Sequence, residues 1–345
     1  MKLRLKPLQQ QVIVITGATS GIGLATARMA AQRGATLVLA ARNGDALAQL
    51  QEELGQESVT TVEADVAQID DVARIAAKAI ERFGHIDTWI NNAGVSVFGR
   101  LEEVAPEDHR RLFETNFWGV VNGSLEAVRH LRTRGGALIN LGSEASDRAI
   151  PLQGMYSASK HAVKGFTDSL RVELEHEKAQ VSVTLVKPAA IDTMFTVHAK
   201  NYMEREPALP PPIYAPELVA KAILFAAEHP KRDVFVGGAA KAMSLGGFHM
   251  PGLMDKYMAG ALFKQQKSDQ PSVHGRTDAL HQSDPSQALR ERLGMSIKVA
   301  ESAPYTALSL RSRPILLALL GGGAAYAAWH MASRARSKQS ALAVL

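Results

Sequence analysis

VIVITGATSGIG, residues 12–23, joins a short β-branched run to three closely spaced glycines, and a helical pattern follows from Ile22 to about Arg33. The apolar run at 12–16 predicts a buried strand that stops at Gly17. Glycines in the spacing G-x-x-x-G-x-G let the chain turn tightly and let backbone N–H groups approach a pyrophosphate at the positive end of a helix. Glycine-rich turns also occur without a ligand, but this strand–loop–helix context predicts a dinucleotide site.

The rest of the chain alternates short apolar runs with helical patterns. Further strands are predicted at residues 36–41, 59–63, 86–90, 137–141, 181–186 and 234–236. Helices are predicted at residues 22–33, 69–83, 106–116, 118–132, 156–178 and 216–228. Such alternation is typical of βαβ units. We therefore expect an α/β fold of the Rossmann type, a doubly wound parallel sheet with helices on both faces and ligands at the carboxyl ends of its strands.

The end of the second strand indicates which dinucleotide is bound. Proteins that use NAD usually place an acid there, roughly 20 residues beyond the glycine loop, whereas the 2′-phosphate of NADP calls for arginine. This chain has Ala41 and then Arg42, and the nearby Asp45 is expected to cap a helix that begins near Ala46. Arg42 therefore favours NADP(H) over NAD(H), unless it is simply a solvent-exposed arginine.

Tyr156 and Lys160 are four residues apart near the start of the predicted helix 156–178. This spacing puts both side chains on one helix face. A phenol has a pKa of about 10, so it carries protons poorly near neutral pH unless a positive charge favours the phenolate, and Lys160 is placed to supply that charge. The pair suits general acid/base catalysis at a carbonyl or an alcohol. The same spacing also arises by chance on many amphipathic helices.

Small and polar residues follow three other predicted strands. Asp65 and Val66 follow strand 59–63, residues 91–94 read Asn-Asn-Ala-Gly, and Ser143 lies just past strand 137–141. Small and amide residues at a strand end suit close approach of the backbone to a ligand, although they also suit a plain turn. In a parallel sheet all of them are expected near one edge.

In combination, these motifs resemble a short-chain dehydrogenase/reductase of the ordinary, non-extended type, over roughly residues 10–240. The resemblance rests on TGATSGIG at 16–23, NNAG at 91–94, Asn116, Ser143, and YSASK at 156–160, in that order. It implies a catalytic tetrad of Asn116, Ser143, Tyr156 and Lys160. In that family the serine hydrogen-bonds the substrate oxygen and the tyrosine transfers the proton. The lysine holds the nicotinamide ribose and tunes the tyrosine, and the asparagine supports a proton-relay water.

The resemblance also implies the cofactor contacts. They are expected at Gly17, Thr19, Ser20, Gly21, Ile22, Gly23, Arg42, Asp65, Val66, Asn92, Ala93, Gly94, Tyr156, Lys160, Pro188, Ile191 and Thr193. The sequence departs from the family pattern at Ala189, where most members have glycine, and at Ser20, where NADP(H) users often have a basic residue. Because alanine adopts a left-handed backbone poorly, the resemblance does not fix the local path beside the nicotinamide amide.

Composition limits the classes of protein. The chain has 345 residues, of which 46% are hydrophobic, enough for a sizeable core. It has no cysteine, and its histidines form no metal-binding motif, so no metal is expected. Residues 311–345 carry the whole net charge of +5, which leaves a neutral body and argues against nucleic-acid binding. The start shows no signal-peptide cleavage site, so we expect a cytoplasmic protein.

Three regions are predicted along the chain. Residues 1–245 form the dinucleotide-binding catalytic domain, residues 246–310 a short helical extension and a polar linker, and residues 311–345 a basic-flanked apolar tail. Little order is expected at residues 265–303. Residues 314–333 lack formal charge and are long enough to span a bilayer, although three glycines and six alanines weaken insertion. The alternatives to a membrane span are a helix that lies on the membrane surface and a helix that docks on the body of the protein or on a partner.

The predicted substrate lid at residues 194–214 contains Met194, Phe195, Tyr202 and Met203. These side chains suit a hydrophobic substrate, or they simply pack the lid onto the body. The sequence as a whole predicts an NADP(H)-dependent oxidoreductase that interconverts a carbonyl and an alcohol on a small hydrophobic substrate, with Tyr156 as general acid/base. The resemblance implies a homodimer or homotetramer assembled through the helix that holds Tyr156.

Two other classes of function compete with this prediction. One is a non-catalytic dinucleotide-binding sensor or scaffold, and the other is an epimerase or dehydratase on the same fold. A pure binder has no need for Asn116 and Ser143 in register with Tyr156, and the epimerases and dehydratases usually carry a differently spaced glycine loop. Both observations favour the oxidoreductase.

Overall fold

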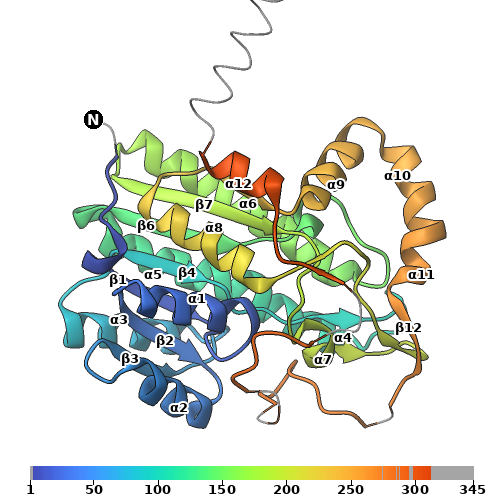
Figure 1. Ribbon diagram of the computed structural model, residues 1–345, viewed down its shortest axis with the longest axis horizontal. Coiled ribbons are helices and arrows are strands. Elements are labelled where there is room, and N and C mark those ends of the chain that lie inside the picture. The colour runs from blue at the N-terminus through green and yellow to red at the C-terminus, as the bar shows by residue number, and fades with distance from the viewer. Residues whose placement is uncertain (1–2, 274, 285, 287, 295–297, 312–345) are drawn as a thin grey trace, which may run out of the picture. The chain divides into compact units, whose positions relative to one another are not determined.

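A computed structural model describes residues 3–273, 275–284, 286, 288–294 and 298–311 (Figure 1). Contacts between residues divide the chain into two compact units, residues 1–306 and 307–345. The first unit contains every predicted catalytic and cofactor-binding residue. The predicted apolar segment 314–333 lies outside the described residues.

The first unit is built on a seven-stranded parallel sheet in the order β11-β7-β6-β4-β1-β2-β3. Its strands are β1 (Val12–Thr16), β2 (Thr36–Ala41), β3 (Val59–Glu63), β4 (Thr88–Asn91), β6 (Gly136–Leu141), β7 (Val181–Pro188) and β11 (Asp233–Val236). The strand order runs outward from β1 in one direction and from β4 in the other. Ligands of such sheets bind at this switch point, outside the carboxyl ends of the strands. The predicted doubly wound α/β fold is confirmed.

Strand β1 lies in the middle of the sheet because it is apolar on both faces. All five of its residues are buried, and Val14 pairs with Val38 of β2 on one side and Trp89 of β4 on the other. A parallel strand covered on both faces needs a continuous apolar run rather than an alternating one. The glycine loop that follows β1 is thereby held at the switch point.

Helices cover both faces of the sheet (Figure 1). On one face α1 and α8 pack together, and on the other α3, α5 and α6 pack over a core that includes Ile75, Leu131, Leu170 and Trp89. The bounds are α1 (Gly21–Gln32), α2 (Gly44–Leu54), α3 (Ile69–Phe83), α4 (Pro106–Phe113), α5 (Gly119–Arg134), α6 (Gly154–His176) and α8 (Pro216–Glu228). This layering fixes the start of α1 and the start of α6, which carry the two ends of the predicted site.

Helices α4 and α5 are joined differently from the prediction of two helices separated at residue 117. The chain passes from one to the other through a π-helical turn, Glu114–Trp118. A π turn holds one more residue than an α turn and is frequent at functional sites. Here it turns Asn116 into the interior, where its side chain is fully buried.

The start of α2 also differs from the prediction that Asp45 caps it. The side chain of Asn43 is the cap, since its Oδ1 accepts a hydrogen bond from the amide of Ala46 at 3.0 Å. Asp45 instead lies in the first turn, where the positive end of the helix dipole favours a carboxylate. The chain therefore passes from β2 through Arg42 straight into a capped helix.

Beyond residue 237 the chain forms helices and short strands. The helices are α9 (Gly238–His249), α10 (Pro251–Tyr257), a π turn at Met258–Leu262, and α11 (Phe263–Gln265). Strand β12 (Lys267–Pro271) pairs antiparallel with β9 (Arg205–Pro207) of the lid. Part of the region predicted to have little order therefore extends the lid.

After β12 the chain crosses the carboxyl edge of the sheet, and we call residues 275–284 and 288–294 the crossing segment. Leu280 of this segment is fully buried. Leu289 donates its amide to the carbonyl of Thr19 at 2.8 Å, and the carbonyl of Arg290 accepts from the amide of Gly21 at 2.9 Å. The structure thus differs from the predicted loose linker, because backbone hydrogen bonds to the glycine loop hold a segment whose composition is polar.

Candidate active site

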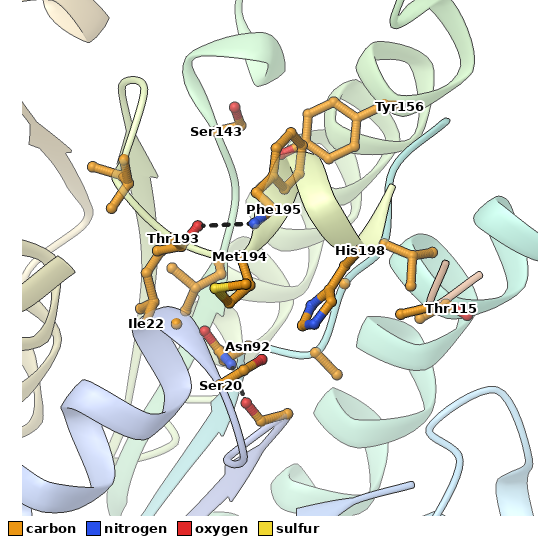
Figure 2. Close-up of a pocket in the computed structure, with 18 of the residues that line it drawn as sticks. Ser20, Ile22, Asn92, Thr115, Ser143, Tyr156, Thr193, Met194, Phe195 and His198 are labelled. Atoms are coloured by element: carbon orange, nitrogen blue, oxygen red, sulfur yellow. Dashed lines mark hydrogen bonds between the residues drawn. The ribbon is translucent and has the colours of Figure 1, made fainter. Parts of the chain in front are cut away.

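A cavity of about 280 Å³ lies at the carboxyl ends of the strands (Figure 2). It brings together nearly all the residues predicted from the sequence. Those that line it are Gly17, Thr19, Ser20, Gly21, Ile22, Arg42, Asp65, Val66, Asn92, Ala93, Gly94, Ser143, Tyr156, Lys160, Pro188, Ile191 and Thr193. The two remaining predicted residues, Gly23 and Asn116, do not line the cavity.

The glycine loop is packed so closely that two positions have no room for a side chain. Gly17 has φ +66°, and a Cβ there would lie 2.8 Å from the Cα of Ala93. A Cβ on Gly23 would lie 2.1 Å from the carbonyl oxygen of Gly17 and 2.5 Å from Nδ2 of Asn92. Asn92 ties the loop to the end of β4, since its Nδ2 donates to the carbonyl oxygens of Thr16 and Gly17 at 2.9 and 3.1 Å.

The start of α1 fits the pyrophosphate of a dinucleotide. Ser20 occupies the N-cap position, but its side chain makes no capping hydrogen bond. Within the described part of the chain, the amides of Ile22 and Gly23 have no hydrogen-bond partner. The first N–H groups of a helix need partners from outside and lie at the positive end of its dipole. A phosphate oxygen would be such a partner.

Ser143, Tyr156 and Lys160 meet at another part of the cavity. Ser143 follows β6, and its Oγ accepts a hydrogen bond from the amide of Ala145 at 3.1 Å. Lys160 lies one helical turn after Tyr156 on α6, with its Nζ 5.8 Å from the centre of the tyrosine ring. The same Nζ donates to the carbonyl oxygen of Leu141 at 2.8 Å, which fixes the ammonium at the end of β6.

Burial decides the protonation of this pair. It raises the pKa of Tyr156 to about 12, although the hydrogen bond with Ser143 acts to lower that pKa. It lowers the pKa of Lys160 to about 8. We predicted that Lys160 would favour the phenolate, but the cost of removing the phenolate from water is the larger effect. At neutral pH Tyr156 is therefore a protonated phenol, the form that donates a proton.

Asn116 stands behind the cavity wall rather than in it. Its Oδ1 accepts from the amide of Val95 at 2.8 Å, and its Nδ2 donates to the carbonyl oxygen of Val95 at 2.9 Å and to Oγ of Ser159 at 3.3 Å. The carboxamide thus fixes the loop after β4 against α6.

Arg42 lines the cavity at the end of β2, and its guanidinium already has partners. It donates to the carbonyl oxygens of Ala279 and Leu280 in the crossing segment, at 2.5 and 3.2 Å. Burial lowers the pKa of Arg42. The alternative of a simple solvent-exposed arginine therefore does not hold. A guanidinium has five N–H donors, so these two bonds leave others for a ligand.

The lid places Met194, Phe195 and His198 in the cavity wall (Figure 2). The amide of Phe195 donates to Oγ1 of Thr193 at 3.4 Å, and its ring packs edge-on against Tyr156 with centroids 5.3 Å apart. Burial lowers the pKa of His198, which keeps its imidazole neutral at pH 7. The lid therefore covers the tyrosine with apolar and uncharged groups.

The two other apolar lid residues singled out in the sequence do not line the cavity. Tyr202 donates its hydroxyl to the buried Asp108 at 2.6 Å, and Met203 packs in a separate cluster with Phe98. Ala189, where the family usually has glycine, avoids a left-handed backbone and donates its amide to the carbonyl of Val236 at 2.9 Å. The chain therefore stays paired with β11 just past Pro188.

Sequence reasoning missed several residues of the cavity wall. From the body and the lid these are Thr115, Glu144, Gln153 and His198, and from the crossing segment Ala279, Ser283, Asp284 and Ala288. Glu144 directly follows Ser143, so that proximity was a usable signal. The crossing segment gave none, because its bonds to Arg42 and to the glycine loop join residues more than 200 positions apart.

The fold and this cavity define a dinucleotide-binding oxidoreductase of the Rossmann class. Residues 11–203 match the family model described as short chain dehydrogenase, and the chain belongs to that family. It is 47% identical over 340 residues to an uncharacterized oxidoreductase, YxnA, of Bacillus subtilis, covering 97% of this chain and 94% of the relative.

Solved structures give the same assignment. A short-chain dehydrogenase/reductase from Burkholderia phymatum in complex with NAD matches with a TM-score of 0.65 and 26% identity, over 78% of this chain and 100% of that one. A short-chain dehydrogenase from Burkholderia cenocepacia in complex with NADP matches with a TM-score of 0.62 and 29% identity, over 73% and 99%. A nicotinamide dinucleotide is thus the cofactor class, with both forms represented among similar structures.

Proposed function

We propose that this protein is an NADP(H)-dependent oxidoreductase that interconverts a carbonyl and an alcohol on a small hydrophobic substrate, with Tyr156 as general acid and base. The observation that carries the proposal is the convergence of Ser143, Tyr156 and Lys160 on the cavity that the glycine loop also lines. When bound, the nicotinamide supplies or accepts the hydride.

The chain's own residues hold the substrate oxygen and move the proton. In the reducing direction the Ser143 hydroxyl hydrogen-bonds the carbonyl oxygen, and Tyr156 donates its proton as negative charge develops there. The ammonium of Lys160, fixed by the Leu141 carbonyl, lies close enough to stabilise the phenolate that remains. Asn116 acts as a positioning residue, since it holds the loop at Val95 against α6.

Two observations support NADP(H) as the preferred form. Arg42 lines the cavity at the end of β2, and the residues beside it, Ala41 and Asn43, carry no carboxylate that would hold a ribose 2′-hydroxyl. The free N–H groups of the guanidinium suit a 2′-phosphate.

Replacement of Arg42 by alanine is expected to raise the KM for NADPH by about 10- to 100-fold, the equivalent of one charge-assisted hydrogen-bond pair. The KM for NADH is expected to change by less than about threefold, because no 2′-phosphate is lost. Initial rates with each cofactor measure this. Arg33→Ala is the matched control, since Arg33 pairs with Glu228 away from the cavity. An equal loss with both cofactors would contradict the role in discrimination.

Apolar side chains support a hydrophobic substrate. Val95, Ile150, Met194, Phe195 and Leu209 all line the cavity. The test is NADPH oxidation by the purified full chain against a broad panel of carbonyl compounds. Turnover of apolar ketones or aldehydes is expected. Turnover of small polar sugars alone would overturn the substrate class, and NADPH binding without any turnover would favour a sensor or scaffold.

We also propose that the protein assembles as a homodimer or homotetramer through α5 and α6. Leu125 of α5 and Val172 of α6 are 47% and 60% exposed, and Trp118 at the start of α5 is 52% exposed. Large apolar groups gathered on a surface mark association sites. Light scattering on the purified chain measures this assembly, and a mass of 37.1 kDa, that of one chain, would refute it.

We propose a cytoplasmic protein that the segment 314–333 attaches to a membrane. Among the described residues no helix has the length and apolar character needed to cross a bilayer. The segment itself lies outside those residues, and its support is a 20-residue stretch without formal charge between Arg313 and Arg334. After cell fractionation the full chain is expected in the membrane pellet and a chain ending at residue 310 in the supernatant. Full-length protein wholly in the supernatant would refute the anchor.

A further inference from the structure

Glu144 is a buried acid at the reacting end of the cavity. It follows Ser143 directly, opens the short helix Glu144–Ser146, and lines the cavity together with Ile150 and Tyr156. Only 9% of its surface is exposed. Ser143 and Glu144 are adjacent in the chain and line the same cavity, so a ligand that Ser143 holds lies on the side of the cavity that Glu144 also lines.

The carboxyl of Glu144 lacks the partners that buried acids normally have. Asp108 is 1% exposed and bonds Tyr202, Lys200 and His281, and Asp87 is 6% exposed and pairs with Lys6. Within the described part of the chain, no cation or hydrogen-bond donor contacts the Glu144 carboxyl. An unpartnered carboxyl in an apolar wall costs free energy, so a structural role does not explain it.

Two further observations tie Glu144 to the reaction. Burial raises the pKa of Glu144 to about 7. At neutral pH about half of the molecules therefore carry a protonated carboxyl, which can donate a hydrogen bond, and the others carry a carboxylate, which only accepts. The charge of Glu144 also acts to raise the pKa of Tyr156, and both side chains line the same cavity. A partner for this carboxyl in the ligand therefore lies beside the reacting oxygen.

The chemistry of the neighbourhood selects the partner. A substrate ammonium would be opposed by Lys160, whose Nζ lies 5.8 Å from the Tyr156 ring centre. The surrounding side chains Val95, Ile150 and Phe195 favour an uncharged molecule. A substrate hydroxyl suits the carboxyl in both of its protonation states. It donates to the ionised carboxylate and accepts from the protonated carboxyl.

We infer that Glu144 sets the substrate specificity of this site by binding a second oxygen, so that the preferred substrates are hydrophobic ketones with a hydroxyl on the neighbouring carbon. This inference rests on the proposed carbonyl reduction. It makes Glu144 a substrate-binding residue beside the proton-transferring Tyr156.

The test compares 2-hydroxyacetophenone with acetophenone, which lacks only the second oxygen, on the full-length protein with saturating NADPH. The wild type is expected to prefer the hydroxyketone in kcat/KM by about 10- to 100-fold, since a site built to bond a hydroxyl rejects the analogue without it. Glu144→Leu is expected to bring that ratio close to one, and Glu144→Gln, which keeps donor and acceptor, to retain part of it. Glu52→Gln, an exposed acid on α2, is the control with the wild-type ratio.

A purely structural role of Glu144 gives a different result. Glu144→Leu would then lower kcat/KM for both ketones by the same factor, together with the melting temperature or the affinity for NADPH. That outcome, or a wild-type ratio near one, would overturn the inference. Leucine suits an apolar wall, so folding of the variant is expected.

The inference can fail separately from the proposed function. If neither ketone is reduced, calorimetric titration of the NADPH-bound protein with each ketone decides it. Tighter binding of 2-hydroxyacetophenone that Glu144→Leu abolishes would support the Glu144 subsite while the reaction itself is rejected. Equal binding of the two ketones would reject the subsite.

Discussion

Replacement of Tyr156 by phenylalanine is expected to lower kcat for carbonyl reduction by about 10²- to 10⁴-fold, the usual contribution of a positioned general acid. Phenylalanine keeps the ring that packs edge-on against Phe195 and removes only the proton donor and its hydrogen bond with Ser143. The measurement is single-turnover reduction with saturating NADPH, so that binding and chemistry are separated.

Folding and cofactor binding should survive this change. The affinity for NADPH, followed by fluorescence, is expected to stay within about fivefold of the wild type, because the loss of one hydrogen bond costs about 1 kcal/mol at most sites. Tyr257→Phe, which removes a hydroxyl from an exposed position on α10, serves as the matched control and should leave kcat unchanged. Undiminished activity of Tyr156→Phe would refute the proposed mechanism.

The pKa of Tyr156 adds a directional expectation. Because burial raises that pKa to about 12, the phenol stays protonated, and its capacity to donate persists, through pH 6 to 10. Alcohol oxidation needs the phenolate, so its rate is expected to climb with pH across the same interval. A pH profile of both directions measures this contrast, and an oxidation rate that levels off below pH 8 would show that a bound ligand lowers the pKa of the tyrosine.

Replacement of Gly23 by alanine is expected to abolish dinucleotide binding at accessible concentrations, with an affinity loss of about 100-fold or more. The added Cβ would lie 2.1 Å from the carbonyl oxygen of Gly17, which is backbone and cannot rotate away. It would also lie 2.5 Å from Nδ2 of Asn92, the group that ties the loop to β4. Relief of both contacts requires the glycine loop to move, at a cost of about 1–3 kcal/mol in stability.

Dinucleotide affinity by calorimetry and the melting temperature together test this prediction. Gly252→Ala is the control, because a Cβ there meets nothing within 4 Å. It should leave both quantities near their wild-type values. An unchanged NADPH affinity in Gly23→Ala would mean that the loop is not rigidly packed and would undermine its assignment as the phosphate site.

Much of the fold was predictable because its signals are local. The run at 12–16 is apolar on every residue, as a strand buried on both faces must be, and it became β1 in the middle of the sheet. Alternation of strands and helices then leaves few topologies, since parallel crossovers have one hand. The predicted ranges 69–83 and 216–228 are the observed bounds of α3 and α8. Both helices have a clear apolar periodicity that local sequence reports.

Other features depended on contacts that no local pattern reports. The Tyr–Lys spacing predicted a shared helix face, but the raised pKa of Tyr156 comes from the depth of its burial under Phe195 and neighbouring elements. The polar residues 265–303 predicted a loose linker, whereas bonds with Thr19, Gly21 and Arg42 place residues 275–284 and 288–294 on the cofactor side of the cavity. The side chain of Asn116 likewise turns inward because of a π turn at Glu114–Trp118. The helical patterns at 106–116 and 118–132 gave no sign of that turn.

The sequence by itself determined the doubly wound sheet, the glycine loop and a set of site residues of which all but Gly23 and Asn116 line the cavity. These follow from short-range physics: apolar periodicity, the conformational freedom of Gly17, and the four-residue spacing of Tyr156 and Lys160. Only the tertiary structure decided which side chains are dehydrated and which segment closes the cavity. Burial keeps Tyr156 protonated and leaves the Glu144 carboxyl without a partner, and hydrogen bonds to a distant segment hold the Arg42 guanidinium. Both effects depend on residues far apart in the sequence, so no single stretch of the chain predicts them.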